Sequence, residues 1–186
     1  NITPSGTDAA YYNISAPTDV TGSITAAHSS VTSAPAAATD LAYTGAAQPL
    51  VTAGTASNGT MVYALGTDAT TAPSDNYNNT IPTGTNAGTY YVWYMVDGDL
   101  NHSDTTPLCV EVTIAKKELT VSAVTANDKT YDGTTTATGT ITLSGAVSGE
   151  QPTATGTFAF AGANAGNDKT VSVANIGLED NWGTNY

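Results

Sequence analysis

Short runs in which apolar and polar residues alternate are the dominant pattern of this chain. In residues 61–65, Met61, Tyr63 and Leu65 fall on one side, and in residues 108–114 the apolar face is formed by Leu108, Val110, Val112 and Ile114. A side-chain period of two is that of a β-strand with one buried face. We therefore expect a strand at each run.

Residues 90–96 differ because large residues occupy both faces of the run. This pattern predicts a central strand that is covered on both sides. No stretch has a sustained helical period, and turn-forming pairs such as Asn58-Gly59 separate the runs. Strands this short at this spacing predict an all-β fold, with a sandwich or a small barrel as the architecture. Further strands are expected at residues 13–15, 21–25, 119–123, 140–144, 155–160 and 169–174.

Internal similarity indicates related modules. Residues 42–45 read Ala-Tyr-Thr-Gly and recur as Thr-Tyr-Asp-Gly at 130–133, while Gly-Thr-Asn-Ala-Gly-Thr-Tyr at 84–90 recurs as Gly-Thr-Asp-Ala-Ala-Tyr-Tyr at 6–12. A looser copy of the second motif begins at Gly162. Glycine and asparagine permit the positive φ of a tight turn, after which a tyrosine enters the next strand.

The end of the chain reads into its beginning. The C-terminal residues stop after a strand and a turn, and the N-terminal residues look like the closing strands of a module. We expect one unit of a tandem array, divided so that the second of two tandem immunoglobulin-like modules is split across the termini. The expected parts are closing strands at 1–26, a linker rich in Ser, Ala and Pro at 27–35, a first module at 36–115, and a second module at 116–186 that lacks its last strands.

The charge balance narrows the range of partners. The chain has 186 residues and a formal net charge of −12, with four Lys and no Arg against 16 acidic residues. Binding to phosphate backbones or to anionic membrane surfaces requires clustered basic residues, so neither nucleic acid nor membrane is an expected partner. One cysteine leaves no internal disulfide. No stretch reaches the roughly 18 continuous apolar residues of a membrane helix.

Longer motifs carry a family resemblance. Residues 36–115 contain LAYTGAAQPLVTAG at 41–54 and IPTGTNAGTY at 81–90, and they resemble the mostly-bacterial immunoglobulin-like (MBG) repeats. Residues 116–186 contain DKTYDGT at 128–134 and GANAGNDKTV at 162–171, and they resemble the YDG repeat family. The resemblance implies a repeat from a large secreted or wall-attached bacterial surface protein of the adhesin type. It supplies no catalytic residue and no cofactor for positions in this chain.

A cysteine hydrolase has little basis in this sequence. Cys109 lies on the polar face of its predicted strand, seven residues after His102, and His28 lies in the expected linker. A nucleophile and its base must be within hydrogen-bond reach and need a third, orienting group, which is not evident here. We expect no enzyme, and we expect Cys109 to be a half-buried thiol.

The turn after the central strand is a candidate calcium loop. Asp97, Asp99, Asn101 and Ser103 offer oxygen ligands at alternate positions. The sixth and twelfth positions of such a loop, normally glycine and glutamate, hold His102 and Leu108. The alternative is an acidic hairpin turn in which Asp and Asn side chains bond the local backbone.

Two further candidates involve Lys and Trp side chains. Lys129 or Lys169 would be the lysine of an intramolecular Lys–Asn isopeptide bond, although lysine is seldom buried as that bond requires. Trp182 is the candidate for stacking on a sugar, and the alternative is a Trp packed at a module junction. Trp93 belongs to the predicted core.

These observations lead to one functional expectation and one alternative. We expect a stalk or spacer repeat of an extracellular, adhesin-like fibre on a bacterial cell surface or cell wall, joined head to tail to neighbouring copies by strand continuity or strand complementation. The alternative is a ligand-binding module that recognises host glycan or protein.

Overall fold

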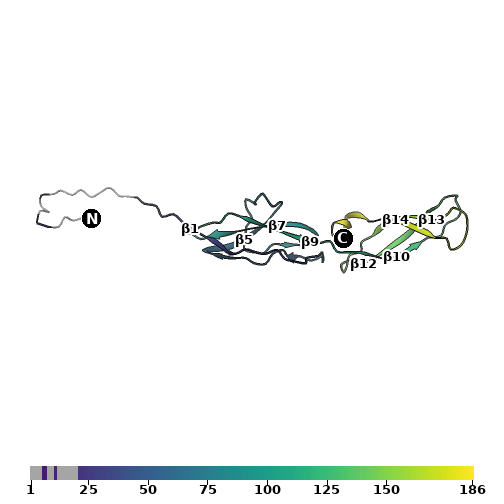
Figure 1. Ribbon diagram of the computed structural model, residues 1–186, viewed down its shortest axis with the longest axis horizontal. Coiled ribbons are helices and arrows are strands. Elements are labelled where there is room, and N and C mark those ends of the chain that lie inside the picture. Colours follow the sequence, from purple (N-terminus) through teal and green to yellow (C-terminus); the bar gives the residue numbers. More distant parts are fainter. Residues whose placement is uncertain (1–5, 8–10, 12–20) are drawn as a thin grey trace.

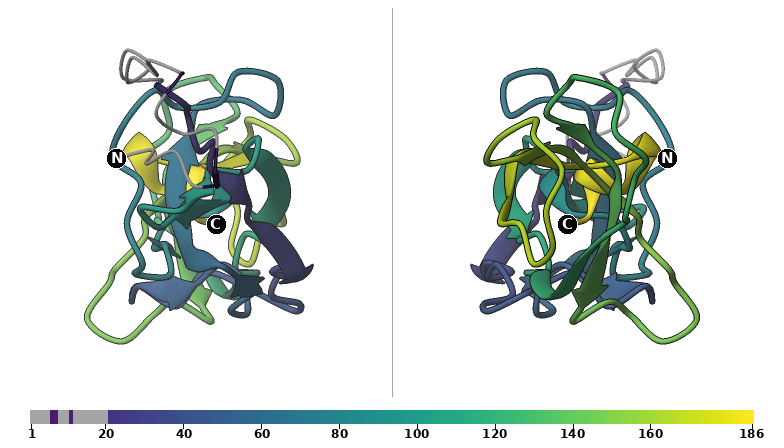
Figure 2. Two further views of the ribbon diagram at one scale, coloured as in Figure 1. Left: turned by 90° about the vertical axis from the view of Figure 1, so that its left-hand side faces the viewer. Right: turned by 90° about the vertical axis from the view of Figure 1, so that its right-hand side faces the viewer.

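The computed structural model describes residues 6, 7, 11 and 21–186. The fold is all-β, as predicted, and the part of the chain from 21 to 186 contains no α-helix. Two units lie end to end along the long axis of the molecule, the first over residues 27–115 and the second over residues 116–186 (Figure 1). Views along this axis show the units in line, one behind the other (Figure 2).

The first unit is built around a three-stranded antiparallel sheet. β7 lies at its centre, between β5 and β9, as the two-faced pattern of residues 90–96 predicted. Shorter pairs, β2–β4, β3–β6 and the parallel β1–β8, complete the unit. Its strands are β1 (Ala27–His28), β2 (Ser30–Ser33), β3 (Gln48–Pro49), β4 (Thr55–Ser57), β5 (Gly59–Gly66), β6 (Thr83–Gly84), β7 (Gly88–Gly98), β8 (His102–Ser103) and β9 (Leu108–Ile114).

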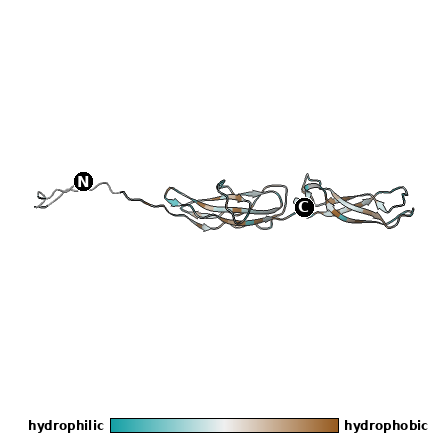
Figure 3. Cartoon of the chain, turned by 90° about the horizontal axis from the view of Figure 1, so that it is seen from above, coloured by the Kyte–Doolittle hydropathy of each residue, from teal (hydrophilic) through white to brown (hydrophobic). Residues whose placement is uncertain are grey.

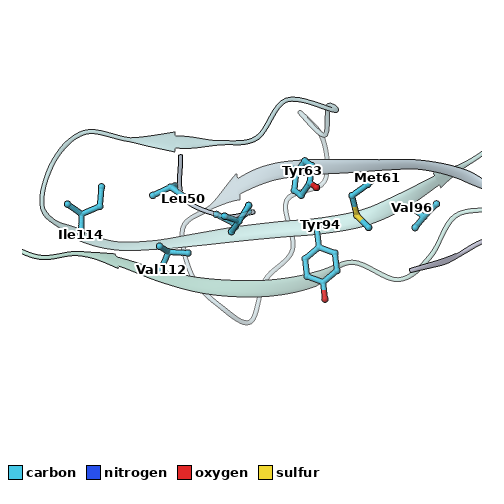
Figure 4. Packing of buried hydrophobic residues seen from close by; sticks show 9 residues of the cluster. Leu50, Met61, Tyr63, Tyr94, Val96, Val112 and Ile114 are labelled. Carbon is cyan, nitrogen blue, oxygen red and sulfur yellow. The ribbon is translucent and has the colours of Figure 1, made fainter. Parts of the chain in front are cut away.

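A continuous apolar core holds the first unit together (Figure 4). Leu50, Val92 and Val96 are fully buried, and Ile114 is 1 % exposed. The alternation in β5 is less regular than the sequence pattern predicted: residues 61–64 are all buried, whereas Leu65 is 48 % exposed. The remaining members of the core cluster are Val51, Met61, Tyr63, Tyr94 and Val112.

The predicted linker at residues 27–35 is wrong. This segment forms β1 and β2, which pair with β8 and β4. Val31 packs against the core, and Ser29 is buried. Serine, alanine and proline reduced the apparent strand propensity of this stretch, but edge strands that are this short tolerate such residues.

The second unit has two small antiparallel sheets. β10 pairs with β12, and β13 lies between β11 and β14. A bulge interrupts the β13–β14 ladder at Asn175, whose φ is 53°. The strands are β10 (Thr120–Ala126), β11 (Thr136–Ala137), β12 (Gly139–Ser144), β13 (Ala154–Phe160) and β14 (Val171–Leu178), followed by the 3₁₀ helix η2 (Asp180–Thr184).

The second unit buries far less of its apolar surface than the first. Apolar residues lie along the strands of both units (Figure 3). Among the described residues of the second unit, however, Ala137 and Phe158 are the only buried hydrophobic ones. Every residue of β10 is exposed, including Val121 and Val124. The two sheets of this unit therefore do not close over a complete core.

The predicted closing strands are absent wherever the structure describes them. Residues 21–26, which include the strand predicted at 21–25, belong to no strand and are exposed throughout. Ile24 is completely exposed. The strand predicted at residues 13–15 lies outside the described residues.

Candidate functional site: the junction between the two units

The last residues of the second unit turn back toward the first unit. Asn185 follows η2, and its backbone N–H donates to the carbonyl of Trp182 at 3.2 Å. The N–H of Tyr186 donates to the same carbonyl at 3.1 Å. This helical turn places the C-terminus at the end of the second unit that faces the first (Figure 1).

Asn185 is bonded to both units. Its side-chain Oδ1 accepts from the N–H of Ala87, in the β6–β7 turn of the first unit, at 2.8 Å. Its Nδ2 donates to Asn86 Oδ1 at 3.2 Å, and its backbone carbonyl accepts from the N–H of Lys117 at 2.9 Å. Lys116 adds a hydrogen bond from Nζ to the carbonyl of Gly183. One asparagine thus fixes the β6–β7 turn of the first unit to the first residues of the second unit.

An aromatic and carboxylate cluster forms the second part of the junction. The hydroxyls of Tyr43, from the first unit, and Tyr186, from the second, each donate to one carboxylate oxygen of Glu150. The two rings meet edge to face, with centroids 5.5 Å apart. The N–H of Val147 donates to the Tyr186 hydroxyl at 2.9 Å. Hydrogen bonds to a charged acceptor are stronger than neutral ones, so this cluster is a directional link between the units.

The environment keeps both phenols protonated. The hydrogen bond to Glu150, burial and the nearby negative charge raise the pKa of Tyr43 from 10.0 to about 12. Burial and then the hydrogen bond to Glu150 raise the pKa of Tyr186. Because the folded-state pKa of Tyr43 is the higher one, its stabilising contribution is complete below pH 10.0 and is lost as the pH rises through about 12.

Close packing at a glycine completes the contact. Gly45 has a φ of 75°, and a Cβ at this position would lie 3.0 Å from Cγ1 of Val147 in the second unit. The repeated motif at residues 42–45 therefore has a structural role that its sequence did not reveal. Its tyrosine bonds the neighbouring unit, and its glycine lets the backbone approach that unit.

The second unit matches a known protein family. Residues 115–186 match the family model of the YDG domain. The match covers the YDG part of the resemblance stated above, and comparison with curated proteins and with solved structures gives no match. The residues of the YDG unit that reach the junction, from Lys116 to Tyr186, all fall within the matched region.

The turn that carries the Tyr-Asp-Gly sequence is held by an ion pair. Lys129 Nζ lies 2.7 Å from Asp132 Oδ1 and donates to the carbonyl of Thr134 at 2.9 Å. Asp132 Oδ1 also accepts from the N–H of Thr134 at 2.9 Å. Gly133 has a φ of 77°, nearly that of Gly45 in the first unit. The sequence repeat thus corresponds to a repeated backbone turn.

This YDG turn predicts an acid-dependent loss of stability. The ion pair with Lys129 and the hydrogen bonds from Thr134 lower the pKa of Asp132 from 3.8 to about 2. Because the folded-state pKa is the lower one, the contribution is present above 3.8 and is lost as the pH falls through about 2. We expect the melting temperature of the YDG unit to fall more steeply over this interval in the unmodified chain than in Asp132→Asn. Calorimetry at several pH values measures this, and equal slopes in the two proteins would contradict it.

The calcium candidate is arranged as a local turn. Asp99 Oδ1 accepts from the N–H of Asn101 at 2.8 Å and from His102 Nδ1 at 2.7 Å. Asp104 Oδ1 accepts from the N–H of Gly98 at 2.8 Å. These are the local hydrogen bonds of the acidic-turn alternative, and among the described residues none bonds the Asp97 side chain. Within the described part of the chain, no group of three or more His, Cys, Asp and Glu side chains is placed to hold a metal.

Cys109 lies in the position predicted for it. It is half-buried on β9, opposite Trp93 of β7. Burial and the carboxylates of Glu111 and Asp68 raise the pKa of its thiol, which disfavours the reactive thiolate. His102 bonds Asp99, while His28 bonds Ser103 Oγ at 3.1 Å.

The two lysines considered for an isopeptide bond have other hydrogen-bond acceptors. Lys129 bonds Asp132 and Thr134, as described, and Lys169 Nζ donates to the backbone carbonyl of Asn164 at 2.6 Å. Neither nitrogen has an Asn side chain as its acceptor among the described contacts. Trp93 is buried, as predicted, and its Nε1 donates to the carbonyl of Asp68 at 3.0 Å.

Trp182 lies at the junction, which was the alternative to sugar stacking. Its ring centroid is 6.0 Å from that of Tyr186, which contacts Tyr43. No helix in the described residues is long and apolar enough to cross a bilayer.

Four residues that make the junction were not singled out from the sequence: Tyr43, Glu150, Asn185 and Tyr186. The repeated Tyr-x-Gly motif was the one available signal.

Proposed function

We propose that this chain is a spacer repeat of an extracellular, adhesin-like fibre on a bacterial cell surface or cell wall. The observation that carries the proposal is the junction, where Asn185 and the Tyr43–Glu150–Tyr186 cluster fix the two units end to end. A flexible pair of domains would need only a linker. Contacts that involve both backbone and buried side chains restrict bending, and they extend the reach of the molecule.

Several further elements belong to the same proposal. The first unit is proposed to be an MBG-type repeat, and both units are proposed to be immunoglobulin-like sandwiches. The partners are neighbouring copies of the same repeat. The match of residues 115–186 to the YDG domain supports the repeat reading of the second unit.

Small-angle X-ray scattering tests the spacer role. We expect the unmodified chain to scatter as one extended particle in which the two units keep a fixed separation. A control variant with four Gly and Ser residues inserted between Ala115 and Lys116 should show a broad range of separations, because the longer connection no longer holds the turn at Ala87 against Asn185. If the unmodified chain and the insertion variant scatter alike, the junction does not stiffen the molecule and the proposal fails.

One observation favours ligand binding as a second candidate function. Tyr131 is 66 % exposed beside a hollow lined by Lys129, Asn164 and other polar loop residues at the end of the YDG unit away from the junction. An exposed ring beside polar groups can stack on a sugar. A glycan array run with the unmodified chain and with Tyr131→Ala tests this function. Signals that disappear in the variant would support it.

A further inference from the structure

An apolar groove lies open in the YDG unit, between its two sheets. It is lined by Leu119, Val121 and its strand partner Leu143 on one side, and by Ile176 and Leu178 on the other. Val121 is 45 % exposed and Ile176 is 49 % exposed. In the first unit, by contrast, apolar residues of the paired strands β5, β7 and β9 lie in the buried core.

The groove also has free strand edges. Within the described sheets, β10 has β12 as its sole neighbour and β14 has β13 as its sole neighbour. Unpaired N–H and C=O groups therefore border an apolar surface on both sides. An edge of this kind is a template for an added strand, which would pair its backbone and place alternate side chains in the groove.

We propose that this groove takes residues 20–26 of a second copy of the chain as an added β-strand. The inference rests on the proposed function and names the partner that joins one spacer to the next. Three independent features of the chain support this occupant: the side-chain pattern of the segment, its charge, and the distance that it can span.

The side-chain pattern of the segment fits the groove. Val20, Gly22, Ile24 and Ala26 alternate with Thr21, Ser23 and Thr25. One face is therefore apolar and the other is rich in the β-branched and hydroxyl residues that occupy exposed strand faces. Residues 21–26 are exposed and outside every strand, so their backbone is available for pairing.

Charge favours the same segment. Two of the four lysines in the chain, Lys116 and Lys117, line the groove together with one acidic residue, Glu118, so the charged lining is net positive. The first 26 residues contain Asp8 and Asp19 and no lysine. In a chain with a net charge of −12, most other surfaces would repel a second copy.

The segment is too short to reach the groove of its own chain, so a second copy is required. Residue 26 adjoins β1, which pairs with β8 at one end of the first unit, whereas Gly88 of β7 pairs with Ile114 at the junction end. The 11 residues of β7 span about 35 Å at the rise of a strand. Residues 20–26 extend at most about 25 Å. They therefore cannot return to the groove of their own chain.

The geometry of the assembly follows. A segment at one end of the molecule binds a groove in the unit at the other end, so donor and acceptor are different surfaces. Such a contact is heterologous and repeats from copy to copy instead of closing a two-fold dimer. The chain would then associate into linear oligomers, and each contact between copies would add a strand to a YDG unit.

Sedimentation velocity of the full chain at increasing concentration tests this inference. We expect a series of oligomers from the unmodified chain, and association weaker by tenfold or more for Ile24→Asp, because the substitution removes a buried apolar side chain and places a charge in the apolar groove. Thr25→Asp, which changes the outward face, is the matched control and should associate nearly as the unmodified chain does. A chain that stays monomeric at every concentration, or equal effects of the two substitutions, would overturn the inference.

Disulfide trapping tests the contact itself. In a Cys109→Ser background, Ile24→Cys chains mixed with Ile176→Cys chains should form mixed dimers under mild oxidation. Ile24→Cys mixed with Leu100→Cys is the control, since Leu100 is fully exposed on the first unit. Equal trapping in the two mixtures would overturn the inference. A chain that scatters as a stiff rod yet never associates would refute strand addition in the groove and leave the spacer role intact. A flexible chain that associates would refute the spacer role and leave strand addition intact.

Discussion

Replacing Ile114 with alanine is expected to lower the free energy of unfolding of the first unit by about 2–5 kcal/mol. Ile114 is 1 % exposed and belongs to the core cluster. Its Cδ1 faces Gly84, where an added Cβ would lie 3.0 Å away, so backbone and side chain are tightly packed here. Removing three carbons leaves a cavity that the two strands cannot fill. Chemical denaturation followed through the fluorescence of the buried Trp93 measures the loss.

The matched control is Ile176→Ala in the YDG unit. The same chemical change is made there on a side chain that is 49 % exposed, so the expected loss is about 1 kcal/mol or less. The measurement belongs at a dilution where the chain is monomeric, because an occupied groove would bury Ile176. A loss as large as that of Ile114→Ala in the monomer would contradict the view that the YDG unit has an open core.

The second large effect is expected at the junction, for Tyr43→Ala. Tyr43 is 6 % exposed and lies between the units, with its ring against Tyr186 and its hydroxyl on Glu150. Truncating a buried aromatic residue costs about 3–5 kcal/mol, and here part of that cost falls on the contact between units. We expect calorimetry to show the two units unfolding in more widely separated steps. Scattering should show a loss of the fixed separation between them.

Tyr43→Phe separates the ring from the hydroxyl. It keeps the edge-to-face contact and removes one hydrogen bond to a carboxylate, for which about 1.5–3 kcal/mol is expected. It also removes the group whose pKa is raised to about 12, so the alkaline loss of stability above pH 10.0 should become smaller. If Tyr43→Phe loosens the units as much as Tyr43→Ala does, the ring contact contributes nothing to the junction.

Much of the strand content could be predicted from the sequence. The alternation in residues 108–114 and the two-faced run at 90–96 correspond to β9 and to the central β7. The pattern failed for β2, where serine and proline concealed an edge strand with one apolar anchor, Val31. It failed again at Leu65, which continues the period of β5 but is 48 % exposed.

The candidate site was accessible only in part. A Trp packed at a module junction was one alternative for Trp182, and its ring does lie beside that of Tyr186 there. The link between Tyr43 and Glu150 joins residues 107 positions apart, and no local pattern encodes a contact of that range. Periodicity predicts which side of a strand is apolar, but it does not reveal whether a partner covers that side. For this reason the strands of the YDG unit could be predicted while its open groove could not.

The two matching tyrosine turns have a consequence for any larger assembly. Tyr43 lies at the end of the first unit that meets the second, whereas Tyr131 lies beside the loops at the opposite end of β10 from the junction. Both turns therefore face the same way along the long axis. The molecule thus has a direction, and its two ends differ. A filament built by translating it would have two chemically distinct extremities. One would present a bare tyrosine turn to solvent and the other would not, so anchoring and growth would take place on different surfaces.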